Sequence, residues 1–277
     1  LIMCRARYGS EPANALTQSW LAALRDAAYL TSARLAEEKG AFPLFDAEPY
    51  LASETVTGLS PEIRAEIVRH GTRNALLTSI APTGTISLSL ANNASNGIEP
   101  SFAQHYFRNV IREGRKAKEK VDVFSFELLA YRQLVNPRAM PGSDNPDEQL
   151  PEYFTTAEDV KPREHVDIQA AAQKWIDSSI SKTANVPTEF PYEDFKDIYM
   201  YAYEKGLKGC TTFRFNPEAF QGVLVTEKDL KNTLYTFVLE DGTQVSVAGD
   251  EEIEYDGEVH SAANLFDALK EGYYGKF

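Results

Sequence analysis

The chain has 277 residues, 43% of them hydrophobic, which is enough to bury a full core and excludes a disordered tail. Its 28 basic and 41 acidic residues give a formal net charge of -13, so long-range electrostatics disfavour nonspecific binding to nucleic-acid polymers or anionic membranes. No apolar run reaches the roughly 18 residues that a membrane span needs. Any phosphate ligand must therefore be held by a local site.

The two cysteines, Cys4 and Cys210, lie far apart and have no neighbouring Cys/His cluster. This pattern predicts neither a disulfide framework nor a structural zinc site, and it fits a reducing, cytoplasmic setting. The first residues lack the order of a secretion signal, and we expect Leu1 to be an interior point of a longer protein. The four histidines are His70, His105, His165 and His260. Their scattered spacing predicts surface or capping roles and no metal site.

Two helices are predicted in the first quarter of the chain. Apolar residues recur at helical spacing over residues 11–39, with Ser10 before the run and Gly40 after it, which predicts a long amphipathic helix. A capping serine, a proline in the first helical position and a glycine stop predict a second, shorter helix from Ser60 to Gly71.

A short apolar run at residues 75–80 leads directly into the sequence Ala81-Pro82-Thr83-Gly84-Thr85. The run is too short for a confident helix, so we expect a buried strand that enters a tight loop. Residues 135–162 interleave prolines with glycine, serine, aspartate and asparagine, which is typical of a loop.

The next segments alternate between strand and helix patterns. Helical patterns occur at residues 165–178 and at residues 192–205, where acids occupy the first turn. Strand patterns occur at residues 180–186 and 208–213. Strand, helix and strand in this order predict a βαβ unit with parallel strands.

The composition changes from residue 232 onward. Two alternating runs flank an Asp-Gly pair within residues 234–247, which predicts a β-hairpin, and residues 262–270 predict a final helix. We therefore expect a main domain over residues 1–222 and a small α+β domain over residues 223–277.

The clearest local motif is a glycine flanked by hydroxyl residues after the predicted strand, in which backbone N–H groups could converge on an anion. Its residues are Pro82, Thr83, Gly84, Thr85 and Ile86, followed by Ser87. The motif lacks the lysine of the nucleotide triphosphate-binding loop. An ordinary turn between a strand and a helix is the alternative interpretation.

Three further features have a functional and a structural interpretation each. Glu99, in a polar turn, could orient a ribose or a cationic neighbour, or could cap a turn; we rank it with Ser87 as a secondary site residue. The basic stretch 108–120 could meet a phosphate or an acidic partner, or could be a solvated helix face. Cys210 lies within an apolar strand, which favours a buried, inert thiol. We predict no catalytic residue in this chain.

Several blocks in order resemble the carboxy-terminal half of class II, adenosylcobalamin-dependent ribonucleotide reductases. The blocks are NALLTSIAPTGTISL at 74–88, NGIEP at 96–100, SSISKTANVP at 178–187, GLKGCTTFR at 206–214 and YDGEVHSAANLFDALKEGYYGKF at 255–277. The resemblance begins at about Arg7. It implies an α/β fold that is the carboxy-terminal part of a ten-stranded α/β barrel, with a small β-rich appendage.

In that family the Pro-Thr-Gly-Thr loop cradles the substrate diphosphate, so the resemblance implies that Pro82 to Ile86 bind a ribonucleotide. The family's radical cysteine lies in an Asn-Pro-Cys-Gly-Glu loop that is absent here, and neither Cys4 nor Cys210 matches it or the redox pair. Iron-dependent relatives place two adjacent tyrosines where this chain has Phe213-Arg214, which favours a cobalamin-generated radical.

The resemblance further implies that an amino-terminal reductase fragment or chain supplies the radical cysteine and most contacts to adenosylcobalamin. We expect a homodimer of the joined enzyme, which makes deoxyribonucleotides for DNA synthesis. The alternative is a stand-alone phosphate-binding or regulatory module that uses the same loop without reduction chemistry.

Overall fold

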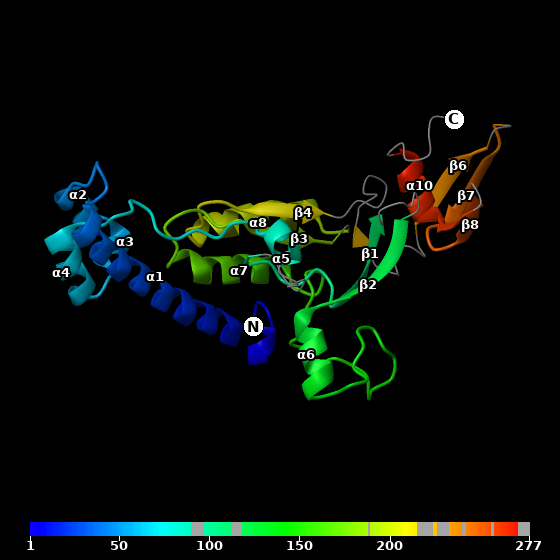
Figure 1. Ribbon diagram of the computed structural model, residues 1–277, viewed down its shortest axis with the longest axis horizontal. Coiled ribbons are helices and arrows are strands. Elements are labelled where there is room, and N and C mark those ends of the chain that lie inside the picture. The colour runs from blue at the N-terminus through cyan, green and yellow to red at the C-terminus, as the bar shows by residue number, and fades with distance from the viewer. Residues whose placement is uncertain are drawn as a thin grey trace. The chain divides into compact units, whose positions relative to one another are not determined.

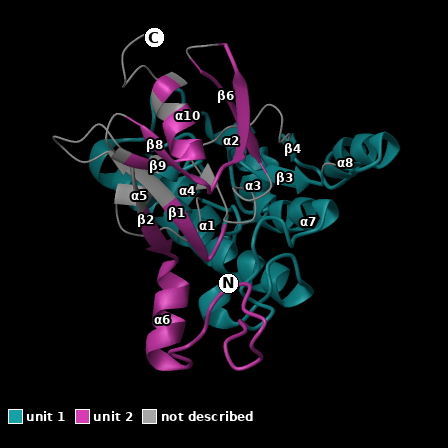
Figure 2. Cartoon of the chain, turned by 90° about the vertical axis from the view of Figure 1, so that its right-hand side faces the viewer, with its two compact units in different colours: residues 1–102, 151–214 teal, residues 103–150, 215–277 magenta. Residues whose placement is uncertain are grey.

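The computed structural model of the protein describes residues 1–89, 97–111, 118–187, 189–214, 224–225, 233–239, 242–255 and 258–270. Its internal contacts divide the chain into two compact units, which Figure 2 colours separately. The first unit comprises residues 1–102 and 151–214, and the second comprises residues 103–150 and 215–277. The predicted domain boundary at 222/223 lies outside the described residues.

The first unit begins with the short 3-10 helix η1 (Ile2–Cys4) and the long helix α1 (Glu11–Lys39). The Ser10 hydroxyl accepts a hydrogen bond from the Ala13 N–H, and Gly40 ends α1 with a φ of 79°. Helix α4 (Pro61–His70) begins after Ser60 and ends at Gly71. Both predicted helices are confirmed, because serine caps and glycine stops are local signals that tertiary contacts did not override.

Two short helices, α2 (Ala47–Ala52) and α3 (Glu54–Thr57), connect α1 to α4. Together these helices enclose an apolar cluster of Tyr29, Ala33, Val56, Leu59, Ile63 and Ile67.

The predicted βαβ unit is confirmed. Strands β3 (Thr183–Val186) and β4 (Thr211–Arg214) pair in parallel, and α8 (Tyr192–Glu204) connects them. Helix α7 (Pro162–Gln173) packs against β3, α8 and α1 (Figure 1). The apolar cluster between these elements is Val166, Ala184, Val186, Ile198 and Ala202.

The expected buried strand at residues 75–80 is wrong. The segment makes one isolated parallel bridge, between Ile80 and Ile180, and Leu76 is 66% exposed. The N–H groups of Leu77 and Thr78 donate to the carboxylate of Asp177 instead of to a neighbouring strand. A side chain thus satisfies donors that a strand ladder would otherwise have used.

In the second unit, β1 (His105–Ile111) pairs antiparallel with β2 (Lys118–Phe124), and β1 also pairs with β5 (Leu224–Val225). Arg108 therefore lies on β1, and Lys118 and Lys120 lie on β2, so the interpretation of the basic stretch as a helix face is wrong for these residues. Residues 112–117 of the stretch lie outside the described residues. The spacing of the basic residues is compatible with a helix or with a hairpin, so it did not predict the strand pairing. Residues 135–161, all described, contain no helix or strand, as their composition predicted.

Helix α6 (Phe126–Leu134) begins at the fully buried Ser125. The Ser125 hydroxyl accepts from the Leu128 N–H at 3.1 Å and donates to Gln104 Oε1 at 2.7 Å. We expect Ser125→Ala to destabilise this unit by about 2 kcal/mol, because the cap and a buried hydrogen bond are lost together. Hydrogen exchange of the α6 amides measures the effect. Ser246→Ala, at an exposed site, should leave that exchange unchanged, and an equal effect of both variants would contradict the prediction.

The carboxy-terminal part of the second unit contains β6 (Leu234–Val238), β7 (Gln244–Ala248), β8 (Glu252–Tyr255), β9 (Glu258–Ser261) and α10 (Ala262–Lys270). Strands β6 and β7 form the predicted hairpin, and α10 is the predicted final helix. Tyr235 and Phe237 of β6 contact Phe266 of α10 edge to face.

The α/β content agrees with the predicted fold class. The described residues form one three-stranded sheet and three two-stranded sheets, and they form no closed barrel. The described parallel pairing is the two-stranded β3–β4 pair, and closing a barrel requires strands that continue around a ring. Within the described parts of the chain, no helix has the length and apolar character needed to cross a membrane.

Candidate functional site

The 82–86 loop (Pro82–Ile86) leads from the Ile80 bridge into the short helix α5 (Gly84–Ser89). Pro82 and Ile86 are exposed, and Thr83 and Gly84 are partly exposed. Thr83 adopts a φ of 52°, in the left-handed region that side chains with a branched Cβ rarely occupy. Such a conformation persists only where the surrounding contacts enforce it, and it is found preferentially at functional sites.

Helix α5 begins within the 82–86 loop. The Ser87 N–H donates to the Thr83 carbonyl at 3.0 Å, which closes the first turn of α5. The N–H groups ahead of Ser87 have no partner within the helix. The Ser87 hydroxyl donates to the Gly84 carbonyl at 2.7 Å, so it stabilises the turn. A left-handed residue followed by helical residues is an arrangement that brings N–H groups together around an anion.

The turn at Gly97 lies directly against this loop. Gly97 has a φ of 59°, and a Cβ atom there would lie 2.6 Å from the Ala81 carbonyl oxygen and 3.6 Å from Thr83 Oγ1. Glycine is therefore required for both its conformation and its close approach. The adjacent Ile98 carbonyl accepts a 2.7 Å hydrogen bond from the Tyr8 hydroxyl, which fixes the turn to the beginning of the chain.

Glu99, the secondary candidate, forms an ion pair that the sequence did not reveal. Its Oε2 lies 2.7 Å from Lys182 Nζ, and its Oε1 accepts a 2.6 Å hydrogen bond from the Thr183 N–H. The Lys182 side chain is 1% exposed, whereas that of Glu99 is 24% exposed. Burial lowers the pKa of Lys182, and the Glu99 carboxylate partly offsets that effect. Both described bonds of Glu99 go to residues 182 and 183, so they agree with the interpretation that Glu99 binds a cationic neighbour and do not cap its own turn.

His165 is buried beside this ion pair, so the prediction of a surface or capping role is wrong for it. Its Nδ1 lies 2.8 Å from Lys182 Nζ. Because an ammonium can only donate, Nδ1 is the acceptor and Nε2 carries the hydrogen. Burial and the Lys182 charge lower the pKa of His165 to about 3, and the backbone of Ala157 opposes this shift.

The structure also tests the roles predicted for the other histidines and for Cys210. His260 is 4% exposed, so a surface role is wrong for it as well. His105 pairs with Asp122 at 2.8 Å, and His70 lies in the last turn of α4. Cys210 directly precedes β4 and is partly exposed, so its predicted place as a buried residue within a strand is wrong. Its partial burial still raises the pKa of the thiol, which agrees with an unreactive sulfur. Among the described residues, no group of three or more His, Cys, Asp or Glu could hold a metal.

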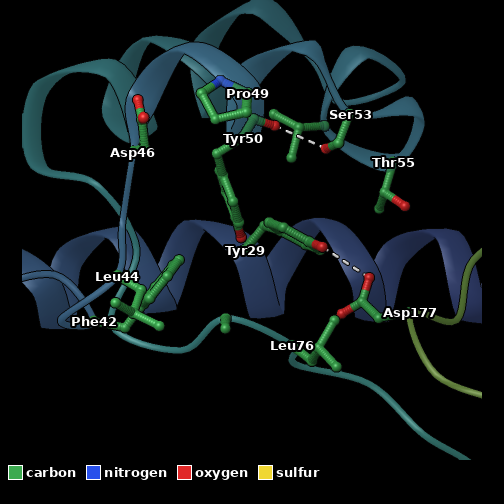
Figure 3. Close-up of a pocket in the computed structure, with 12 residues that line it drawn as sticks. Tyr29, Phe42, Leu44, Asp46, Pro49, Tyr50, Ser53, Thr55, Leu76 and Asp177 are labelled. Carbon is green, nitrogen blue, oxygen red and sulfur yellow. Dashed lines mark hydrogen bonds between the residues drawn. The ribbon is translucent and has the colours of Figure 1, made fainter.

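A separate pocket of about 370 Å³ lies between α1 and the α2–α3 segment (Figure 3). Its lining includes Tyr29, Phe42, Tyr50, Leu76 and Asp177. Figure 3 shows the Tyr50 side chain directed toward Tyr29, whose hydroxyl donates to Asp177. Asp177 also accepts two backbone hydrogen bonds, so its carboxylate is occupied within the protein. The 82–86 loop, which contains N–H groups without a partner inside α5, is therefore the stronger candidate for anion binding.

Comparison with protein families matches residues 1–213 to the family described as "Ribonucleotide reductase, barrel domain". This chain belongs to the ribonucleotide reductase family. A vitamin B12-dependent ribonucleoside-diphosphate reductase of Mycobacterium tuberculosis is 34% identical over 214 residues, which cover 75% of this chain and 28% of that relative. A relative with the same description from Thermoplasma acidophilum is 31% identical over 228 residues, covering 80% of this chain and 27% of the relative.

A vitamin B12-dependent ribonucleotide reductase of Rhodopirellula baltica is 28% identical to this reductase chain over 267 residues, covering 82% of the chain and 25% of the relative. These names confirm the resemblance to class II reductases. The chain spans about a quarter of the length of the curated relatives that it matches.

Proposed function

We propose that this chain is the substrate-phosphate-binding part of a cobalamin-dependent ribonucleotide reductase, and that backbone donors of the 82–86 loop hold the substrate diphosphate. The observation that carries the proposal is the left-handed Thr83 leading into α5, with Gly97 packed against it. Membership of the reductase family supports it. Holding the diphosphate would fix the ribose in place, so the contribution of these residues is positioning.

The radical chemistry belongs to residues outside this chain. Neither cysteine of this chain is assigned the radical: burial raises the pKa of Cys210, and Cys4 is exposed and lies outside the 82–86 loop. An amino-terminal fragment or chain would supply the radical cysteine, the redox pair and the remaining strands of a ten-stranded barrel. The joined enzyme would be a cytoplasmic homodimer.

Adenosylcobalamin would supply the radical when bound. The pocket of about 370 Å³ is near the lower limit for a drug-sized ligand, and a corrinoid with its adenosyl group is much larger. The residues lining it therefore do not fit this cofactor, and we assign no step of the reaction to them. Cobalamin contacts are expected mainly from the amino-terminal part.

Inorganic pyrophosphate provides a direct test of the loop. Thr85→Pro removes one backbone donor in the first turn of α5, where proline is compatible with helical geometry. We expect about tenfold weaker pyrophosphate binding, because a hydrogen bond to a charged acceptor is lost. Isothermal titration calorimetry measures the affinity. Thr85→Ala keeps the N–H and should bind as the wild type does; equal weakening in both variants, or no binding by the wild type, would contradict the proposal.

A complementation assay tests whether this chain needs the amino-terminal part for activity. The chain is mixed with adenosylcobalamin, a ribonucleoside diphosphate and a reductant, with and without the amino-terminal part of a B12-dependent relative. Deoxynucleotide should form only when both parts are present. Product from this chain alone would exclude an external radical cysteine, and failure of the parts to associate would favour the stand-alone phosphate-binding module.

A further inference from the structure

The segment that enters the 82–86 loop touches two other segments of the first unit. The Ile80 carbonyl accepts a 2.9 Å hydrogen bond from the Ser181 N–H, next to the Ile80–Ile180 bridge. The Ala81 carbonyl and Thr83 Oγ1 lie against Gly97. The loop therefore depends on where residues 180–183 and the turn at residues 97–99 are held.

Glu99 joins these two segments directly. One carboxylate oxygen binds the Lys182 ammonium and the other accepts from the Thr183 N–H, at 2.7 and 2.6 Å. Two hydrogen bonds from consecutive residues fix the carboxylate in orientation as well as position. The Ile80, Ile98 and Ile180 side chains pack together in one apolar cluster between the same segments.

Glu99 is the anionic partner of Lys182, whose other described partners are uncharged. Lys182 Nζ also contacts His165 Nδ1 and donates to the Thr183 carbonyl, and both of these acceptors are uncharged. The Tyr8 ring centroid lies 5.9 Å from the ammonium, and Tyr8 also binds the Ile98 carbonyl. Removing Glu99 would leave an ammonium that is 1% exposed without an anionic partner, so the contacts around it would rearrange.

We propose that the Glu99–Lys182 clamp is a positioning device for the 82–86 loop: it holds the turn at residues 97–99 against residues 180–183 and so keeps Gly97 packed on Ala81 and Thr83. This inference rests on the proposed phosphate-binding function. Glu99 and Lys182 contact no reacting atom in this assignment. They set the conformation that the backbone donors adopt before the substrate arrives, which reduces the ordering that binding requires.

The first unit offers a matched control in the Arg7–Glu164 pair. Glu164 also binds one cation, at 3.0 Å from Arg7 Nη1, and one backbone N–H, that of Lys161 at 2.9 Å. Its side chain is 23% exposed, close to the 24% of Glu99. Its described bonds go to Arg7 and to Lys161, which directly precedes α7, and not to the 82–86 loop. Glu164→Gln therefore imposes the same chemical change at a different place.

The test measures backbone order and pyrophosphate affinity in the full chain. In Glu99→Gln, NMR order parameters of the amides of residues 83–86 should fall from the rigid value of ~0.85 toward ~0.6. Pyrophosphate affinity should fall about tenfold. Lys182→Met should reproduce both changes, and the Glu99→Gln/Lys182→Met double variant should add little to either single change.

Glu164→Gln should leave both the order parameters and the affinity unchanged. Unchanged order at residues 83–86 in Glu99→Gln, or an equal loss in Glu164→Gln, overturns the clamp. If the wild type does not bind pyrophosphate, the proposed function fails, whereas the order parameters still decide whether the clamp holds the loop. The two failures are thus distinguishable.

Discussion

Replacing His165 by glutamine is expected to prevent most of the loss of stability that the first unit undergoes between pH 6.5 and pH 5. The pKa of His165 is lowered to about 3 in the folded chain, from an ordinary value of 6.5. Between these values the unfolded chain binds a proton that the folded chain does not, so stability falls as pH falls, by about 1.4 kcal/mol per pH unit. The wild type should therefore lose about 2 kcal/mol over this interval.

The cause of the shift is local. A protonated His165 would place a second positive charge 2.8 Å from the Lys182 ammonium, in a site where the side chains are almost fully buried. Glu99 is the anion paired with Lys182, while Tyr8 and Cys210 have pKa values raised by burial. One carboxylate cannot offset two buried cations, so the proton is excluded.

Urea denaturation at several pH values measures this effect. Both tryptophans, Trp20 and Trp175, belong to the first unit, so their fluorescence follows its unfolding. The free energy of unfolding of His165→Gln should vary less with pH than that of the wild type. His70→Gln is the control, because it makes the same substitution in the last turn of α4, outside the described contacts of Lys182, and it should keep the wild-type slope. Equal slopes in all three proteins would contradict a neutral, buried His165.

Local signals in the sequence predicted the helices well. Ser10 with Gly40, and Ser60 with Gly71, mark helix ends by satisfying or terminating backbone hydrogen bonds. The βαβ unit was predictable because alternating and helical periodicities succeed one another within a short stretch, and the handedness rule leaves few ways to connect them. These elements depend mainly on neighbours in the chain.

Long-range polar pairs were not predictable in this way. Glu99 and Lys182 are 83 positions apart, and each has an ordinary sequence context. His165 has no metal-like spacing, so its burial follows from the packing of α7 and not from a motif. A lone lysine directly before an alternating apolar strand was the available signal for Lys182, and it is weak because most lysines beside strands are solvated.

The structure of the 82–86 loop was predictable only in part. Proline, glycine and hydroxyl residues predicted a turn, and the family resemblance gave the turn a ligand. The left-handed conformation of Thr83 could not be predicted, because threonine disfavours it. The close approach of Gly97 to Ala81 and Thr83 was not predictable either, because the turn signals at residues 82–86 do not show which segment lies against the loop.

Asp177→Ala is expected to be among the most destabilising single substitutions in the first unit, with a loss of about 3 to 5 kcal/mol. The carboxylate accepts from the Tyr29 hydroxyl at 2.7 Å and from the Leu77 and Thr78 N–H groups at 2.8 and 3.1 Å. Asp177 is 9% exposed, so water cannot readily replace it. The substitution leaves three donors without their acceptor, and unsatisfied buried donors cost more than the bonds themselves contribute.

Two variants separate this cause from a general effect of losing an aspartate. Tyr29→Phe removes one of the three bonds and should cost about 1 to 2 kcal/mol. Asp197→Ala, at an exposed position of α8, should change stability by less than about 0.5 kcal/mol. Tryptophan fluorescence during urea denaturation measures all three. A similar loss in the Asp177 and Asp197 variants would show that the network contributes little.

The hydrogen bonds of the Asp177 carboxylate also hold the segment that leads to the 82–86 loop. They hold residues 77–78 in an extended segment without strand pairing, and that segment continues to the Ile80 bridge. Asp177→Ala should therefore reduce backbone order at residues 77–80 more strongly than Tyr29→Phe, because Tyr29 binds the other carboxylate oxygen. The same NMR measurement as for the clamp checks this. Equal disorder in the two variants would mean that the bond from the Tyr29 hydroxyl, and not the bonds from Leu77 and Thr78, determines the order of this segment.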